Sequence, residues 1–329
     1  MKTIYCSTGK SGWSTYYDAY FLKKYITDYN FVLKSVSLPN NKNDILLFTD
    51  PGAFCSVAAD VARFPNKIVC WWHGDINTNN NGVQKRIPIA QKHLKKCKKI
   101  IVSCQQGMDS VLSFGVDPEK ICLIPLGVDL DIFYQTSMTK CREKYNIPQN
   151  SFCVGSFQRD TDKLGGPKWI KGPDVISKSL GIVNQKIDDL FVVLSGPRRS
   201  YITKELRSRN IKVLHVNVSK YEEMFSLYNC LNCYIIGSRV EGGPKSLIES
   251  TACGVPVVST DCGMASDVIT KSNGFLVPVD DFQGLSSSLL NIYNKDTIFD
   301  KDVVRQSILR FDYKTNICLK YKNLFDGFD

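Results

Sequence analysis

One segment of the chain constrains the fold more than any other: the nine residues EGGPKSLIE, from Glu241 to Glu249. An apolar run, CYIIGS, precedes this segment and ACGVPVVST follows it, so the predicted order is strand, glycine-bearing turn, helix and strand. Pro244 suits the first helical position, where its missing N–H would be unpaired anyway, and Gly254 ends the helix. The segment is therefore predicted to be a parallel βαβ unit.

The start of this predicted helix suits an anion. The backbone N–H groups of residues 243–246 have no acceptor within the helix, and the helix dipole makes this end positive. Two carboxylates flank it, because Glu241 lies in the turn and Glu249 lies about one and a half turns into the helix. An acid beside an anion site indicates a second, neutral binding partner, such as the hydroxyl groups of a sugar.

Short β-type runs alternate with helical stretches along all 329 residues. This alternation is typical of parallel sheets covered by helices on both faces. The predicted strands are TIYCS, FVLKSVS, DILLFTD, KIVCWW, KIIVSC and ICLIPLG in the first half, then FCVGSF, LFVVLSG, KVLHVNV, CYIIGS, PVVST and GFLVPV. The turn-rich NIPQNS, near residues 148–151, divides them into two domains.

Composition narrows the class of protein and its partners. The 13 cysteines are scattered through predicted strands and helices, and the N-terminus turns polar too quickly for a signal peptide, so we expect a cytoplasmic location. Residues 1–145 hold 19 Lys and Arg against 12 Asp and Glu, which is +7 of the net charge of +10. This basic half indicates either an anionic partner, namely acceptor phosphate or an acidic membrane surface, or simply a solvated lysine-rich face.

EGGPKSLIE followed by ACGVPVV resembles the signature of glycosyltransferase family 4, retaining enzymes of the GT-B fold. KIIVSCQQGMDSVLSFGVDPEKICLIPLGVDLDIF is similar to the end of that family's N-terminal domain, and CVGSFQRD with WIKGPDVI is similar to the opening of its C-terminal domain. The resemblance implies two doubly wound, Rossmann-like α/β domains that face a cleft. We expect an acceptor-binding domain over 1–148, a nucleotide-sugar-binding domain over 149–310, and a C-terminal helix over 311–329 that returns to the N-terminal domain.

Two cations are predicted to hold the donor diphosphate. Arg159 follows the strand FCVGSF, and Lys171 begins the predicted helix KGPDVISKSL. A planar Arg fork and a Lys point charge match the charge of a diphosphate, and the family uses an arginine and a lysine in these places. An insertion, DTDKLGGPKWI, separates them, so Lys163 and Lys168 are alternatives. With these cations present to neutralise the diphosphate, we expect no metal and no other cofactor.

The resemblance also assigns roles within EGGPKSLIE. Glu249 is expected to bind the ribose hydroxyls of the nucleotide, and Glu241 is expected to lie near the transferred sugar. The remaining residues predicted to contact the donor are Gly242, Gly243, Pro244, Lys245, Ser246 and, after the strand LFVVLS, Gly196.

Three residues of the first half are further candidates. His73 follows the strand KIVCWW, where the family has a histidine that contacts the donor sugar. Gly12 lies in the loop STGKSGWST; this loop contains TGKS but lacks a Walker A motif, because Ile4 stands where that motif needs a glycine. Ser103, at the end of KIIVSC, matches a family position that lines the cleft.

These observations together predict a retaining glycosyltransferase that moves a sugar from a UDP- or GDP-sugar to a hydroxyl of a glycan, a lipid or a small molecule. We expect no nucleic-acid partner, and peripheral association with the inner membrane face through the basic half is an additional hypothesis. The alternatives are a catalytically silent sugar- or nucleotide-binding module of the same fold, and a GT-B-fold epimerase.

Overall fold

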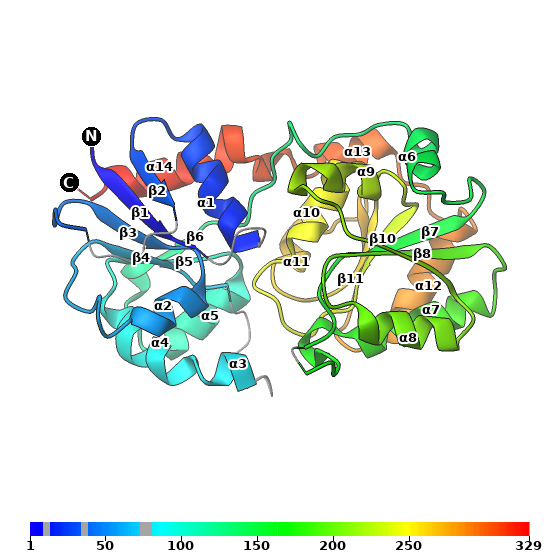
Figure 1. Ribbon diagram of the computed structural model, residues 1–329, viewed down its shortest axis with the longest axis horizontal. Helices are drawn as coiled ribbons and strands as arrows, with labels where there is room; N and C mark the ends of the chain where they lie inside the picture. Colours follow the sequence, from blue (N-terminus) through cyan, green and yellow to red (C-terminus); the bar gives the residue numbers. More distant parts are fainter. Residues whose placement is uncertain (9–13, 34–38, 73–80, 163, 329) are drawn as a thin grey trace. The chain divides into compact units, whose positions relative to one another are not determined.

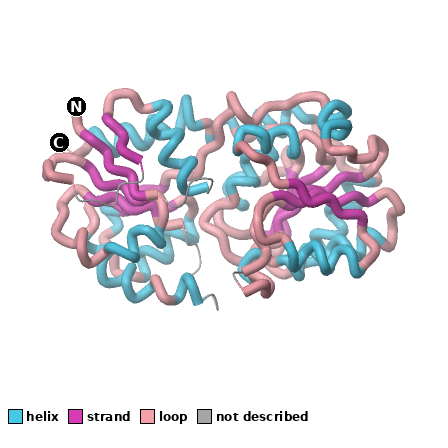
Figure 2. The backbone as a smooth tube through the Cα atoms, viewed as in Figure 1, coloured by secondary structure: helices cyan, strands magenta, loops and turns pink. Residues whose placement is uncertain are grey.

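The computed structural model describes residues 1–8, 14–33, 39–72, 81–162 and 164–328. This part of the chain contains two six-stranded parallel sheets with helices on both faces of each (Figures 1 and 2). All twelve predicted strands are present, so the predicted fold class is confirmed. Several strands end earlier than predicted, where the chain leaves the sheet at its carboxyl edge.

The strands are β1 (Thr3–Ser7), β2 (Asn30–Leu33), β3 (Ile45–Phe48), β4 (Lys67–Cys70), β5 (Lys99–Val102), β6 (Ile121–Leu123), β7 (Phe152–Ser156), β8 (Leu190–Ser195), β9 (Lys212–Val216), β10 (Cys233–Ile236), β11 (Val257–Thr260) and β12 (Gly274–Val277). The α-helices are α1 (Ser14–Tyr25), α2 (Pro51–Val57), α3 (Asn81–Gln84), α4 (Ile87–His93), α5 (Gln105–Ser113), α6 (Met138–Lys144), α7 (Pro173–Asn184), α8 (Ser200–Ser208), α9 (Met224–Tyr228), α10 (Lys245–Ala252), α11 (Ala265–Val268), α12 (Phe282–Tyr293), α13 (Lys301–Gln306) and α14 (Cys318–Asp326). Short 3-10 turns include η3 (Trp169–Lys171) and η4 (Tyr221–Glu223).

The chain divides into two compact units. The first unit consists of Met1–Asp129, Val240–Gly243 and Arg310–Asp329. Its sheet has the order β2-β1-β3-β4-β5-β6, with α1 and α14 on one face and α2, α4 and α5 on the other (Figure 1). Apolar side chains of β3, β4 and β5 form the core against α2, α4 and α5, since these strands are buried on both faces.

The C-terminal segment belongs to the first unit although it follows the second unit in sequence. Its backbone begins beside Val128, whose N–H donates to the carbonyl of Phe311 at 2.9 Å. The Tyr313 ring packs on the Phe21 ring of α1 with a centroid distance of 4.9 Å, and its hydroxyl donates to Asp18. The segment therefore covers the α1 face of the first sheet.

The second unit consists of Leu130–Arg239 and Pro244–Leu309. Its sheet has the order β12-β11-β10-β7-β8-β9, with α7, α8 and α12 on one face and α9, α10 and α13 on the other (Figure 1). The core between the sheet and the α7 face is built from Val, Ile and Leu side chains of β7, β8 and β10 together with those of α7, α8 and α12.

The contacts place residues 130–148 with the second unit, whereas the sequence predicts the domain boundary after residue 148. Two arginines hold this stretch. Arg142 is buried and donates to the carbonyl of Cys230 at 2.9 Å and to the side-chain oxygen of Asn232 at 2.7 Å. Arg305 donates to the carbonyls of Phe133 at 2.6 Å and Leu130 at 3.1 Å. These long-range polar contacts have no local signature in the sequence.

Candidate functional site

The sheet of the second unit has one point where its strand order reverses. The chain runs outward from β7 to β8 and β9, and then returns to place β10 on the other side of β7. The helices that follow β7 and β10, α7 and α10, lie on opposite faces of the sheet (Figure 1). Open α/β sheets bind their ligands at such a point, beyond the carboxyl ends of the strands.

The structure brings most of the predicted residues of the second half to this edge of the sheet. Arg159 and Lys171 lie on the connection that follows β7, Gly196 follows β8, and the segment through Glu249 follows β10. Because β10, β7 and β8 are neighbours, these three connections leave the sheet side by side.

Arg159 is half-buried beyond the end of β7. Burial, together with the charge of Arg198, lowers the pKa of its guanidinium. Two cations held close to each other repel, and a bound anion would relieve that repulsion. The electrostatics at this position therefore favour a negatively charged ligand.

Lys171 ends the turn η3 and does not begin α7, so the predicted start of that helix was wrong. Gly172, with φ of +56°, separates the turn from the helix. A Cβ at Gly172 would lie 1.7 Å from the carbonyl oxygen of Gly237, so only glycine allows α7 to approach β10 this closely.

Gln158 joins the two sides of the reversal point. Its Nε2 donates to the carbonyl of Lys171 at 2.8 Å, and its Oε1 accepts from the Ser238 hydroxyl at 3.1 Å. Ser238 follows β10, so this one side chain fixes the Lys171 turn relative to the β10 connection.

The helix α10 begins at Lys245, one residue later than predicted. Pro244 is its N-cap, with φ of −73° and ψ of +108°, and its carbonyl accepts the N–H of Leu247 at 3.0 Å. Lys245 is buried and Ser246 is half-buried. The first amides of this helix lie beside the neighbouring β7 connection, so they complete an anion-favouring edge.

Glu249 lies in the second turn of α10, where only 5% of it is exposed. Tyr221 donates its hydroxyl to Oε1 and Tyr228 donates its hydroxyl to Oε2, the latter at 2.7 Å. A buried carboxylate is costly unless it is hydrogen-bonded, and each of its oxygens has such a donor here.

Tyr234, in β10, links the same helix to the β7 connection. Its hydroxyl accepts the backbone N–H of Phe157 at 2.7 Å, and its side chain also hydrogen-bonds Ser246. Burial, the largest effect on this group, raises its pKa to about 12. Tyr234 is therefore a neutral structural element that fixes the first turn of α10.

Gly196 follows β8 with φ of +88°, a conformation that suits glycine. Its carbonyl oxygen lies 2.8 Å from Nε2 of His215, which is in β9. The backbone of the β8 turn is thereby tied to the outer strand of the sheet.

Residues 240–243, which include the predicted Glu241, group with the first unit. The Ser103 hydroxyl, directly after β5, donates to the carbonyl of Gly242 at 2.5 Å. A Cβ at Gly242 would lie 2.0 Å from the carbonyl oxygen of Trp72, which explains why a glycine stands there. Glu241 and Gly243 are half-buried. Ser103 therefore hydrogen-bonds the backbone of the turn formed by residues 241–243.

Three residues discussed from the sequence fall outside the described part of the chain: Gly12, His73 and the alternative cation Lys163. Their roles stay predictions.

Sequence reasoning missed Gln158, Tyr221 and Tyr228. The tyrosines precede Glu249 by 28 and 21 residues, in a stretch whose pattern only indicates a short helix before β10. The tyrosines themselves, shortly before a buried strand, were the available signal, because a buried tyrosine usually finds a hydrogen-bond partner for its hydroxyl.

The described residues hold neither a cluster of metal ligands nor a membrane-spanning helix. No group of three or more His, Cys, Asp or Glu side chains there is arranged to hold a metal ion. Within the same ranges, the helices are all too short or too polar to cross a bilayer.

Two family models match the chain. Residues 165–306 match the model of glycosyl transferases group 1, and residues 15–132 match that of glycosyltransferase family 4. The first match covers the β10–α10 unit, and the second covers most of the first sheet.

Curated relatives match the chain over somewhat more than half of its length, at low identity. A D-inositol 3-phosphate glycosyltransferase of Paenarthrobacter aurescens is 25% identical over 57% of this chain and 47% of its own length. The capsular polysaccharide biosynthesis glycosyltransferase CapM of Staphylococcus aureus is 25% identical over 61% of this chain and 50% of its own length. The chain spans about half the length of the curated relatives that it matches.

Solved structures resemble the chain over nearly its full length. HepE of Anabaena, crystallised with UDP and glucose, superposes with a TM-score of 0.77 at 15% identity, covering 99% of this chain and all of HepE. Sucrose-phosphate synthase of Thermosynechococcus elongatus gives a TM-score of 0.68 at 20% identity, covering 86% of this chain and 73% of that protein. At these identities, the likeness establishes the fold and nothing beyond it.

Proposed function

Because the chain belongs to glycosyltransferase family 4 and has the GT-B fold, we propose that it is an enzyme that transfers a sugar from a nucleotide diphosphate donor to a hydroxyl acceptor. One observation carries this proposal. The reversal point of the second sheet gathers cations after β7, and helix amides and a buried carboxylate after β10. A nucleotide sugar presents the matching groups, an anionic diphosphate and neutral hydroxyls.

In this proposal the second unit binds the donor. Arg159, Lys171 and the first amides of α10 neutralise the diphosphate, and Glu249 accepts hydrogen bonds from the two ribose hydroxyls. Charge builds up on the diphosphate as the bond to the sugar breaks, so the cations bind the transition state more tightly than the ground state. Lys168 is the alternative cation.

The chemical step that we propose retains the configuration of the sugar. The acceptor hydroxyl attacks from the face that the diphosphate leaves, and a departing phosphate oxygen takes the hydroxyl proton. Glu241 and His73 are assigned to the sugar, as the family resemblance implies. Proton NMR of the first product measures the anomeric configuration, and an inverted product would exclude this step.

In this proposal the donor is a UDP-sugar or a GDP-sugar, and the acceptor is a glycan, a lipid or a small molecule. The names of the relatives include an inositol phosphate and a capsular polysaccharide, both of which present hydroxyl groups.

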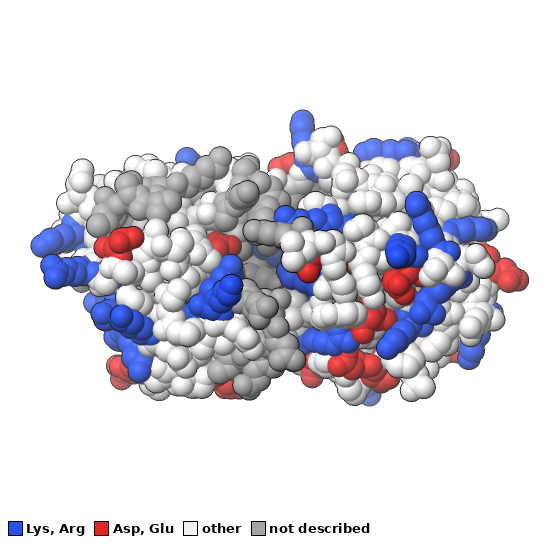
Figure 3. Space-filling model, turned by 60° about the horizontal axis from the view of Figure 1, so that its bottom comes forward, with Lys and Arg blue, Asp and Glu red and all other residues white. Residues whose placement is uncertain are grey.

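Peripheral membrane contact through the basic first half is a further part of this proposal. On the face shown in Figure 3, the Lys and Arg side chains of the first unit stand in separate groups and form no single patch.

A panel of nucleotide sugars tests the function. We expect UDP, GDP or one of their sugars to raise the melting temperature, and the same donor to release nucleoside diphosphate when an acceptor mixture is added. If no nucleotide or donor stabilises the protein, the transferase proposal fails. Stabilisation without release on broad acceptor arrays would instead identify a silent binding module, and conversion of the donor to its epimer would identify an epimerase.

A further inference from the structure

The carboxylate of Glu249 is held on both of its oxygens by aromatic hydroxyls that come from outside α10. Tyr221 belongs to η4 and bonds Oε1, whereas Tyr228 ends α9 and bonds Oε2. One donor on each oxygen fixes the plane of the carboxylate as well as its position. A carboxylate has about four acceptor directions, so two tyrosine hydroxyls do not exhaust its capacity to accept hydrogen bonds.

The two tyrosines are themselves fixed by other rings. Tyr228 is fully buried, and its ring lies 4.9 Å from that of Phe157 and 6.0 Å from that of Phe133, centroid to centroid. The Tyr221 ring meets Phe133 edge to face at 5.4 Å. A ring locked by packing keeps its hydroxyl in one place, because a tyrosine has only two side-chain torsions to lose.

Both tyrosines contact Glu249, but they differ in exposure. Tyr228 is completely buried and Tyr221 is half-buried. Burial, and then the charge of Glu249, raise the pKa of Tyr228 well above its usual value, so its hydroxyl stays protonated and donates at any physiological pH. Water can replace the Tyr221 hydroxyl more easily than that of Tyr228, so Tyr228 has the larger influence on the carboxylate.

We propose that Tyr221 and Tyr228 are positioning residues, which orient the Glu249 carboxylate so that it accepts hydrogen bonds from the vicinal hydroxyls of the donor ribose. They touch neither the reacting sugar nor the diphosphate in this proposal. The inference rests on the proposed function, because it assigns a ribose to Glu249. Its consequence is specific: loss of the tyrosine hydroxyls weakens recognition of the ribose hydroxyls and leaves the rest of the nucleotide contacts intact.

Calorimetric titration of the full chain tests this with matched nucleotides. The probes are UDP and GDP, each with its 2′,3′-dideoxy counterpart, and the proteins are the wild type, Tyr228→Phe, Tyr221→Phe and the double variant. Phenylalanine keeps the ring packing and removes only the hydroxyl. The measured quantity is the ratio of the dideoxynucleotide Kd to the ribonucleotide Kd.

We expect the wild type to bind the better ribonucleotide at least about tenfold more tightly than its dideoxy form, since a hydrogen bond to a charged group is worth about 1.5–3 kcal/mol. Tyr228→Phe should lower this ratio by about three- to tenfold, and Tyr221→Phe by less. The Kd of the dideoxynucleotide should change by less than about twofold, because its contacts do not use the carboxylate.

Tyr145→Phe is the matched control. It removes another tyrosine hydroxyl of the second unit, which lies 2.7 Å from the Ser226 hydroxyl and does not bond Glu249, so the ratio should not change. If the wild type has a ratio above one and every variant keeps it, this inference is wrong while the proposed function stands. An equal loss of affinity for both nucleotides in the variants would also overturn it, since that is what a purely structural role produces. If the wild type binds neither UDP nor GDP, the proposed function fails and this inference fails with it.

Discussion

The two sides of the reversal point in the second sheet are built differently. On the α10 side, Glu249 lies within a regular helix, and two tyrosines, one buried and one half-buried, hold its two carboxylate oxygens. On the β7 side, Arg159 and Lys171 lie on a long connection, which polar side chains such as Gln158 hold in place. Recognition of a diol needs an acceptor fixed in direction, whereas a diphosphate attracts a cation from many directions. We infer that the α10 side fixes the direction of a hydrogen-bond acceptor, whereas the β7 side supplies positive charge.

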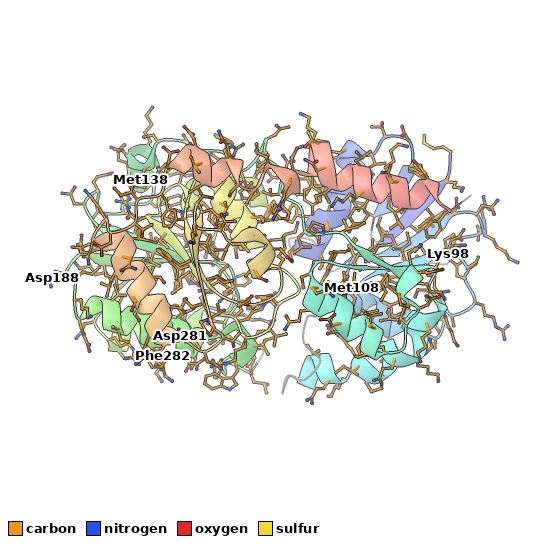
Figure 4. The ribbon with its side chains drawn as sticks, turned by 180° about the vertical axis from the view of Figure 1, so that it is seen from behind. Lys98, Met108, Met138, Asp188, Asp281 and Phe282 are labelled. Atoms are coloured by element: carbon orange, nitrogen blue, oxygen red, sulfur yellow. The ribbon has the colours of Figure 1, made fainter. Side chains whose placement is uncertain are left out.

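Arg239 connects the two sides. It lies three residues after β10, and its guanidinium bonds both carboxylate oxygens of Asp174 in α7, at 2.9 and 2.8 Å, as well as the carbonyl of Trp169 at 2.7 Å. Arg239 also forms an ion pair with Asp280 at 2.7 Å. Asp280 directly precedes Asp281, which is the N-cap of α12 and is labelled in Figure 4. The Lys171 turn is therefore fixed to the end of β10 by charge, in contrast to the aromatic packing around Glu249.

The largest expected effect comes from removing charge on the β7 side. Arg159→Ala should lower kcat by about 10²–10³-fold with a smaller change in the donor KM, because in the proposed function its charge acts mainly on the departing diphosphate. Release of nucleoside diphosphate at saturating donor measures this. Lys168→Ala is the control, and a larger loss of kcat there than in Arg159→Ala would move the assigned cation to Lys168.

Gly172→Ala tests how tightly the β7 side must pack. The new Cβ would meet the carbonyl of Gly237, and Gly172 itself has a φ of +56°, which alanine adopts only with strain. We therefore expect a loss of about 3 kcal/mol in the free energy of unfolding. Gly165→Ala is a matched control, because Gly165 also has positive φ (+87°) but, among the described residues, no atom within 4 Å of the new Cβ. It should cost only about 1 kcal/mol. Equal losses in urea denaturation would show that the contact with Gly237 is unimportant.

Glu249→Gln tests the α10 side. The change preserves shape but replaces the charged carboxylate that, in the proposed function, accepts hydrogen bonds from the ribose hydroxyls, so the Kd for the ribonucleotide should rise by about 10- to 100-fold. In contrast to Arg159→Ala, kcat at saturating donor should fall much less. Glu222→Gln, an exposed neighbour in η4, is the control and should leave the Kd unchanged. An unchanged Kd in Glu249→Gln would remove Glu249 from the donor site.

The smallest effect is expected from the charge link between the sides. Burial raises the pKa of Asp174, but hydrogen bonds and the charge of Arg239 outweigh this, and the pKa lies below its usual value of 3.8. The pair therefore stabilises the fold above pH 3.8, and the stabilisation is lost as the pH falls through the lowered pKa. Asp174→Asn should cost about 1 kcal/mol at pH 7 and less at pH 3 in urea titrations. A cost that is the same at both pH values would argue against an ionic contribution.

The sequence predicted the parts of the molecule that depend on local pattern. Alternating apolar runs located all twelve strands, and the EGGPKSLIE segment placed Glu249 on a helix beyond a central strand. It did not reveal the tyrosine partners of Glu249 or the arginines that attach Leu130–Pro148 to the second unit, because these contacts join residues far apart in sequence. Local helix ends were also misplaced: Gly172 in a left-handed conformation leaves Lys171 outside α7, and Pro244 caps α10 without entering it.

The attachment of Arg310–Asp329 to the first unit has a consequence for the order in which the protein is made. Tyr313, Tyr321 and Phe325 are almost wholly buried within that unit, and they are synthesised after the whole of the second unit. Domains usually complete folding in the order of their synthesis. Here the sheet that emerges first must wait for residues 310–329, which follow the second unit in sequence, to cover its α1 face, so the second unit can complete its core before the first.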